Sequence, residues 1–176
     1  SKYTNSPYSH AALAYWEGMQ LYCLEFREFK GSRQYLLDDY LREGYKIDVF
    51  RTMSVFEHPV IEYTHNKGYY LSYDTHIFNS NVANNIVTEA KQLLGLQYSW
   101  FTIIKMAKTY IPFLRFKTNH KHDDDWYETH SYVCSTLITY CYRKHFIDPV
   151  PFLSDRYTSP GDLARSGLFF KLFSIK

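Results

Sequence analysis

The order of hydrophobic patterns along the chain is the feature that most constrains its fold. In the first third, short apolar runs are separated by turn residues, which predicts strands at 10–16, 20–26 and 46–51. Beyond about residue 84, apolar residues recur at helical spacing. Strands followed by helices are typical of an α+β fold, and 176 residues are enough for one domain with its own core. We therefore predict a single α+β domain over 1–176, with a small antiparallel sheet packed against a few helices.

Several shorter elements follow from turn residues. The sequence Glu17-Gly18 predicts a turn that joins the first two strands into a hairpin. Gly31 interrupts the strand pattern, and 32–41 has the apolar spacing of a short helix. The runs 59–63 and 69–73 flank the turn sequence 66–68, which predicts a second hairpin.

Cap residues predict where the later helices begin. Asn84 or Asn85 can cap a helix that runs to about Leu94, and Ser99 can cap another that ends before Pro112. A further helix is expected at 133–145, after a polar loop at 117–127. The tail, 149–173, reads as loop-rich, with a short helix that begins near Pro160.

Cys134 is the first candidate for chemistry, because it lies at the expected start of a helix. The positive end of the helix dipole favours a thiolate there. The alternative is that Cys134 is an inert, buried apolar residue. Cys141 lies about two turns further along the same helix and Cys23 lies within a strand, so we expect both to be structural. Three cysteines in unrelated contexts argue against a disulfide framework.

His10 is the candidate base for this thiol. It is expected to open an otherwise apolar strand, where it could face a cleft, although a backbone partner could equally satisfy its ring. His130 is a rival because it precedes Cys134 by only four residues, but it lies in a polar loop. The stretch from His120 to His130 also contains several aspartates, yet its spacing matches no metal template, and a mobile charged loop is the better interpretation.

A third polar group is needed to orient the base. Glu25, on the second strand of the hairpin, is our choice because a carboxylate can hold an imidazolium and fix its tautomer. Tyr22 and Glu28 are alternative candidates for this role, because a one-residue change of strand register would turn the other face of the strand toward His10.

Composition limits the possible partners. The net charge of +2 gives no electrostatic case for nucleic acid, and no apolar run is long enough to span a membrane. The 18 tyrosines and 13 phenylalanines are mostly structural, but they are compatible with a glycan-bearing substrate. No motif implies a metal or an organic cofactor. The sequence begins at Ser1 rather than Met, so the compartment stays open, and so does the oligomeric state.

A series of motifs gives the chain a resemblance to a known family. In sequence order they are Ser9-His10-Ala11, a strand ending near Glu25, Ile47-Asp48-Val49-Phe50-Arg51, residues 93–100, Val133-Cys134-Ser135-Thr136-Leu137 and Ser159-Pro160-Gly161-Asp162-Leu163. The chain resembles the circularly permuted branch of the NlpC-type, papain-like cysteine hydrolases. That branch includes bacterial and viral hydrolases and is related to lecithin:retinol acyltransferase.

The resemblance implies a papain-like fold and a soluble thiol hydrolase. Cys134 would be the nucleophile, His10 the general base and Glu25 the third, polar residue, while Tyr98 would lie near the active site and help the oxyanion or line the pocket. The implied substrate is an amide, such as a peptide of a bacterial cell wall. A lipid or thioester substrate with the same residues is one alternative, and an inactive scaffold or binding module of a viral or secreted assembly is another.

Two features depart from the family pattern. The family usually has a strand with a Gly-Asp pair well before the histidine, whereas only nine residues precede His10, so we expect a fragment or a processed product. The region around 53–83 is also longer than the family's usual link. We expect this insertion to carry specificity or to form a docking surface.

Overall fold

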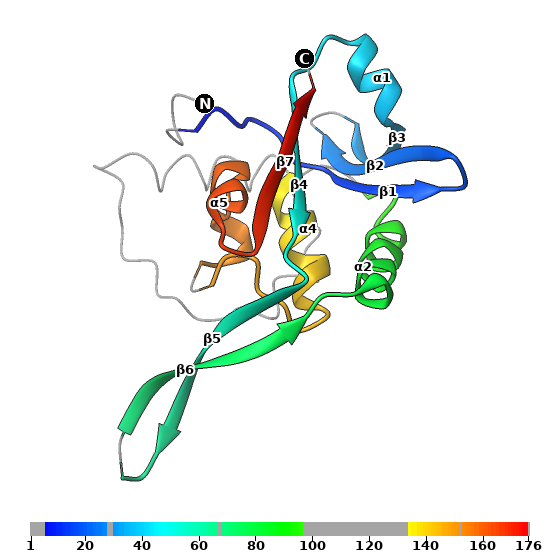
Figure 1. Ribbon diagram of the computed structural model, residues 1–176. Helices are drawn as coiled ribbons and strands as arrows, with labels where there is room; N and C mark the ends of the chain where they lie inside the picture. Colours follow the sequence, from blue (N-terminus) through cyan, green and yellow to red (C-terminus); the bar gives the residue numbers. More distant parts are fainter. Residues whose placement is uncertain (1–5, 28–29, 67, 97–133, 152, 176) are drawn as a thin grey trace.

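A computed structural model describes residues 6–27, 30–66, 68–96, 134–151 and 153–175 (Figure 1). Its strands form three small antiparallel sheets, and its helices are short. The strands are β1 Leu13–Glu17, β2 Gln20–Arg27, β3 Gly31–Leu36, β4 Ile47–Thr52, β5 Val55–Thr64, β6 Gly68–Ile77 and β7 Phe169–Ile175. The helices are α1 Leu37–Arg42, α2 Ser80–Gln92, α4 Cys134–Arg143 and α5 Pro160–Arg165, with a 3-10 helix, η3, at Asp155–Tyr157. The predicted α+β class is confirmed.

The first sheet has the order β1-β2-β3. The β1–β2 hairpin was predicted, and its turn contains Gly18, whose φ of 61° lies in the left-handed region that glycine tolerates. The predicted helix over 32–41 is wrong in its first half. Residues 31–36 extend the sheet by pairing with β2, and only Leu37–Arg42 is helical. Strand pairing, which a local pattern does not reveal, has overridden the helical spacing.

The second sheet joins β4 to β7, which come from distant parts of the sequence. β4 was predicted, but the expectation of a loop-rich tail over 149–173 is wrong from 169 onward, because Phe169–Ile175 forms β7. The register shifts between Val49 and Phe50, which marks a β-bulge. On β7, Lys171 Nζ forms an ion pair with Asp48 Oδ2 at 2.8 Å, and Ser174 Oγ donates a hydrogen bond to Asp48 Oδ1 at 2.6 Å.

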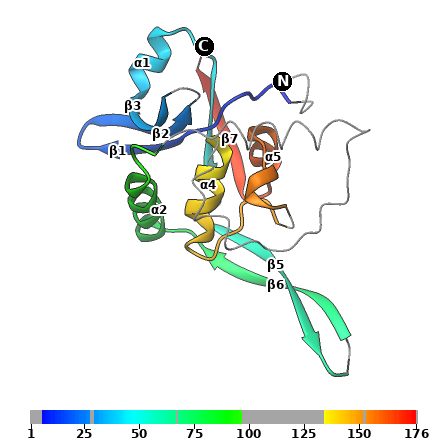
Figure 2. The same ribbon diagram turned by 180° about the vertical axis from the view of Figure 1, so that it is seen from behind.

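The third sheet is the β5–β6 hairpin, which projects from the rest of the protein (Figures 1 and 2). The prediction of a hairpin here is confirmed, although each strand is ten residues long and therefore longer than expected. The hairpin accounts for most of the region around 53–83 that the sequence marks as an insertion.

Two capping motifs fix the helices that flank the core. α2 begins earlier than predicted because Asn79, rather than Asn84 or Asn85, is its N-cap and accepts hydrogen bonds from the backbone of Asn81 and Val82. α5 begins at Pro160, as expected, with a capping box between Ser159 and Asp162. The expected helix from Ser99 and the polar loop at 117–127 lie outside the described residues.

The core forms around α4, which contacts β2, α2, η3 and α5 (Figure 2). Its buried apolar residues come mainly from β2, α2 and α4, and include Leu24, Phe26, Ile86, Ala90, Leu137, Ile138, Cys141 and Tyr142. β2 therefore buries one face against the helices and leaves its other face for Glu25 and its neighbours. In the part of the chain that the structure describes, no helix is long and apolar enough to cross a membrane.

Candidate active site

Cys134 is the first residue of α4, and only 8% of it is exposed. The start of this helix is held by two buried hydroxyls that bond to the backbone beside η3. Ser135 Oγ donates to the carbonyl of Thr158 at 2.5 Å, and Thr136 Oγ1 donates to the carbonyl of Asp155 at 3.3 Å. These bonds fix the first described turn of α4, which carries Cys134, and the position of the thiol at the start of the helix stays a prediction because residue 133 lies outside the described residues.

His10 lies just before β1 rather than on it. The pairing of β1 with β2 begins at Leu13, so the expectation that His10 opens the strand is wrong. Tyr8 anchors this segment elsewhere, because its hydroxyl donates a 2.8 Å hydrogen bond to Asp48 Oδ2 on β4. The buried Ser6 packs against Gly161 so closely that a Cβ at Gly161 would lie 2.5 Å from Ser6 Oγ. The segment that carries His10 is thus attached to β4 and to α5.

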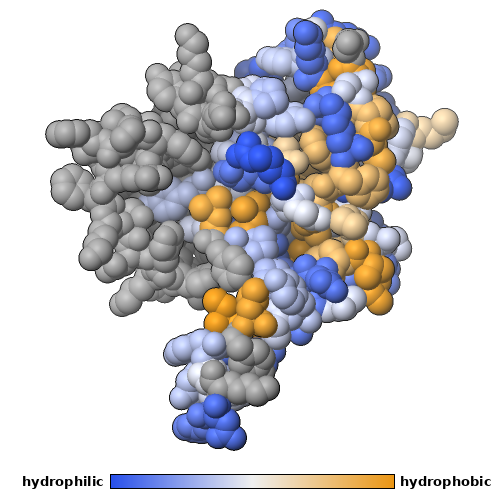
Figure 3. Space-filling model, turned by 60° about the vertical axis from the view of Figure 1, so that its left-hand side comes forward, coloured by the Kyte–Doolittle hydropathy of each residue, from blue (hydrophilic) through white to orange (hydrophobic). Residues whose placement is uncertain are grey.

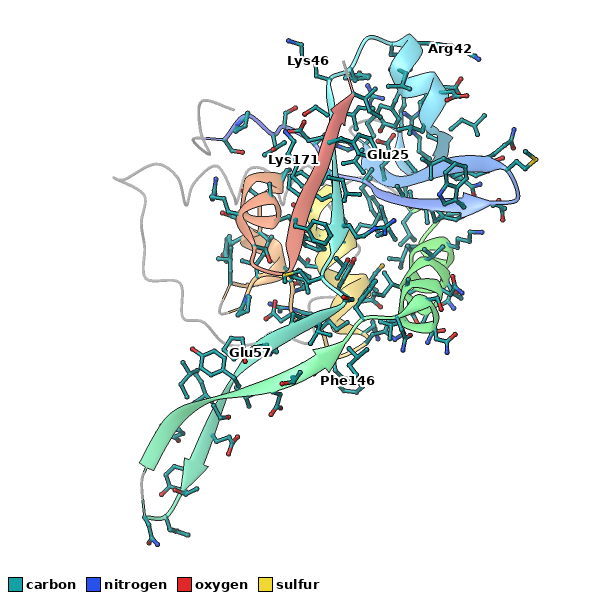
Figure 4. The ribbon with its side chains drawn as sticks, viewed as in Figure 1. Glu25, Arg42, Lys46, Glu57, Phe146 and Lys171 are labelled. Atoms are coloured by element: carbon teal, nitrogen blue, oxygen red, sulfur yellow. The ribbon has the colours of Figure 1, made fainter. Side chains whose placement is uncertain are left out.

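Glu25 lies directly against His10. His10 Nε2 and Glu25 Oε2 are 2.6 Å apart, and the Glu25 side chain has no solvent exposure. Glu25 lies in the crowded interior of the protein (Figure 4). Of the two competitors, Tyr22 donates its hydroxyl to Gln20 instead, and Glu28 lies outside the described residues. The structure therefore brings together His10 and the carboxylate that the sequence favoured.

The pKa of His10 shows how these groups are coupled. Burial lowers it, but hydrogen bonds to Cys134 and to Glu25, with the negative charges of both partners, outweigh burial and raise it from 6.5 to about 9. Burial also raises the pKa of Glu25, but hydrogen bonds from His10 and Arg33 outweigh this effect and hold it below its usual value. Near neutral pH, His10 is therefore an imidazolium that lies between a carboxylate and a sulfur atom.

Arg33 is a member of this cluster that sequence reasoning missed. It lies opposite Glu25 in the β2–β3 register, and its Nε donates a 2.6 Å hydrogen bond to Glu25 Oε1. The guanidinium carbon lies 4.2 Å from the ring centre of Tyr35. Two cations therefore share one fully buried carboxylate, which compensates the cost of burying its charge. Sequence reasoning missed Arg33 because it predicted a helix over 32–41, and a helical Arg33 would not lie opposite Glu25 on a neighbouring strand.

The other two cysteines are in apolar surroundings. Cys23 is 5% exposed and burial raises its pKa to about 11, while Cys141 is fully buried and burial raises its pKa to about 12. All three cysteines of the chain are free. Of the three thiols, Cys134 is therefore the one that interacts with a histidine, His10.

Several sequence candidates lie outside the described residues. These are Tyr98, the rival base His130 and the stretch from His120 to His130. Within the described ranges, no group of three or more His, Cys, Asp or Glu side chains is arranged to hold a metal ion.

No protein-family model matches the chain, and no curated protein matches it in sequence. The chemistry of the site therefore has to be argued from its own geometry.

Proposed function

We propose that the protein is a cysteine hydrolase of the permuted, NlpC-type papain-like kind, which cleaves an amide bond through Cys134, His10 and Glu25. The observation that carries this proposal is the position of His10, whose Nε2 lies 2.6 Å from Glu25 Oε2 and whose pKa is raised by both Cys134 and Glu25. These residues come from three separate segments of the chain, and a thiol beside a histidine that a carboxylate orients is the arrangement typical of nucleophilic catalysis.

The proposed reaction proceeds in two steps. The Cys134 thiolate attacks the carbonyl carbon of the amide, and the imidazolium of His10 donates its proton to the leaving nitrogen as the C–N bond breaks. Neutral His10 then takes a proton from water, which attacks the thioester and releases the acid and the Cys134 thiolate. The negative oxygen that forms in each step would accept a hydrogen bond from the backbone N–H of Cys134.

Glu25 and Arg33 act on this chemistry through His10. Glu25 fixes the orientation of the ring by accepting its Nε2 hydrogen, which leaves Nδ1 for the sulfur. Arg33 keeps Glu25 ionised despite its complete burial. Both are positioning residues, since neither needs to contact the substrate.

The first test is the rate at which iodoacetamide alkylates Cys134, measured against pH by mass spectrometry of the labelled peptide. Because the proposed thiolate depends on the imidazolium beside it, we expect His10→Ala to slow labelling up to about 100-fold at pH 6.5. His76→Ala, which removes a partly buried histidine from the hairpin, is the matched control and should label like the wild type.

Activity is then measured by mass spectrometry on a panel of cell-wall peptides, with lipid esters and thioesters as a second panel. Hydrolysis of an amide that Cys134→Ser and His10→Ala abolish would support the proposal. An acyl adduct formed only with the lipid panel would assign the same residues to acyl transfer. Slow labelling of Cys134 that is indifferent to His10 would overturn the enzymatic assignment and favour a scaffold.

A further inference from the structure

One face of the projecting β5–β6 hairpin is mainly apolar, and only the pair Glu57 and Thr75 interrupts it. In an antiparallel pair, residues opposite one another point to the same side. The register pairs Val55 with Ile77 and Ile61 with Leu71, and all apolar residues at odd positions share this side. We call this surface the apolar hairpin face; it consists of Val55, Pro59, Ile61, Tyr63, Tyr69, Leu71, Tyr73 and Ile77.

The apolar hairpin face is open to solvent. Apart from Pro59, its residues are between 50% exposed, at Leu71, and 79% exposed, at Tyr69. Figure 3 shows hydrophobic side chains at the surface where the hairpin leaves the body. The opposite face is the more polar one, and much of it is less exposed; it includes His58, Glu62, Thr64, Ser72, Asp74 and His76.

This arrangement is the reverse of the usual one, in which a strand turns its apolar side to the core and its polar side to water. A two-stranded hairpin on its own is barely stable in water, and monomers rarely expose an apolar patch of this extent. We therefore expect a binding partner to bury the apolar hairpin face.

The size of the face matches what a stable dimer buries. Three tyrosines and four aliphatic residues of the face are each at least half exposed. Together their side chains present roughly 800 Å² of solvent-accessible surface. A standard protein interface buries about 800 Å² on each partner. One copy of the hairpin thus supplies one half of such an interface.

We propose that the apolar hairpin face of a second copy of this chain covers it, with the two hairpins antiparallel about a two-fold axis near Ile61 and Leu71. Such an interface is self-complementary, because each copy presents the same patch. The centre of the face is uncharged, and its charged residue, Glu57, lies near the body end of the hairpin (Figure 4). At about 3.4 Å per residue, the antiparallel arrangement would place the two Glu57 side chains roughly 25 Å apart, so they would not repel each other.

Charge argues against a membrane as the cover. The hairpin sequence 55–77 contains three acidic residues, Glu57, Glu62 and Asp74, against one lysine, Lys67, so its formal charge is −2. Binding to the anionic surface of a bilayer requires basic residues, each of which contributes about 1 kcal/mol. The proposal is independent of the candidate active site, because the hairpin contains none of its residues.

The test is sedimentation velocity of the full chain over a wide range of concentration. We expect a monomer–dimer equilibrium in the wild type, and Ile61→Lys and Leu71→Lys should each weaken dimerisation at least about 100-fold, because two-fold symmetry buries the new charge twice. Leu172→Lys, which replaces a similarly exposed leucine on β7, is the matched control and should dimerise like the wild type.

Circular dichroism of each variant checks that it is folded, and Tyr69→Glu, near the turn and highly exposed, provides a second perturbation of the same face. A wild type that stays monomeric at the highest concentration, or a dimer that none of the three face variants weakens, would overturn the proposal. Binding of a monomeric wild type to phosphatidylcholine vesicles would also overturn it and identify a lipid surface as the cover.

Discussion

The buried pair between Glu25 and Arg33 leads to a quantitative prediction about stability. Glu25 has no exposed side-chain surface, and Arg33 has 20%. Glu25→Gln keeps the shape of the side chain but removes its charge, which leaves the guanidinium without a counter-ion. Breaking a buried ion pair costs about 3–5 kcal/mol, and because Arg33 keeps some contact with water and with Tyr35, we expect a loss of about 2–4 kcal/mol.

A double-mutant cycle separates the pair from its surroundings. Arg33→Met alone leaves the buried carboxylate with His10 as its remaining cation, so we expect a similar loss. Combining Glu25→Gln with Arg33→Met removes both charges, so its cost should be smaller than the sum of the two single costs. We expect a coupling free energy of about 2 kcal/mol, which is in the range measured for residues in one hydrogen-bonded network.

Urea unfolding near neutral pH measures these differences, provided that the m-value is unchanged. Arg42→Met is the control, since Arg42 forms an exposed ion pair with Asp39 at 3.4 Å and its loss should leave the unfolding midpoint unchanged. Single costs that add to within about 0.5 kcal/mol would refute the reasoning, because the two charges would then be independent.

Three further predictions follow from the segment that carries His10 and from α2. Gly161→Ala should displace the N-terminal segment and slow alkylation of Cys134. Gly167→Ala, whose added Cβ meets no atom within 4 Å, should not slow it. Equal alkylation rates in the two variants would contradict the packing of Ser6 against Gly161. Folding raises the pKa of His10 from 6.5 to about 9, so the proton on His10 stabilises the fold fully below pH 6.5. This contribution is lost as the pH rises through 9. The urea midpoint should therefore fall between pH 6.5 and 9 in the wild type and should not fall in this way in His10→Ala. Asn79→Ala should lower the free energy of unfolding by about 1 kcal/mol, whereas Asn84→Ala should not lower it. The reverse result would show that Asn84, as the sequence suggested, is the N-cap of α2.

The sequence predicted the elements whose interactions are local. The β1–β2 hairpin and the start of α5 at Pro160 each depend on residues close in the chain. The pairing of His10 with Glu25 was also predicted, because the hairpin brings β2 back beside the segment that leads into β1, although His10 itself lies before β1. The papain-like architecture and the catalytic roles stay predictions.

The elements that the sequence missed depend on distant partners. β3 was taken for a helix because its pairing with β2 is not visible in its own spacing, and Arg33 was lost with it. β7 was taken for a loop because its partner, β4, lies at the other end of the chain. The cap of α2 was placed too late because several asparagines lie close together there, and only the backbone conformation at Asn79 selects one of them.

The contacts of Asp48 have a consequence for the order in which the protein forms during synthesis. This carboxylate holds Tyr8, two residues before His10, and is itself held by Lys171 and Ser174. The ribosome releases Ser174 long after β1, β2 and Glu25 are free to fold. A nascent chain therefore has Glu25 in place early but completes the anchor of the segment that carries His10 only when β7 emerges, so Cys134 gains a fully held His10 only after β7 has been synthesised.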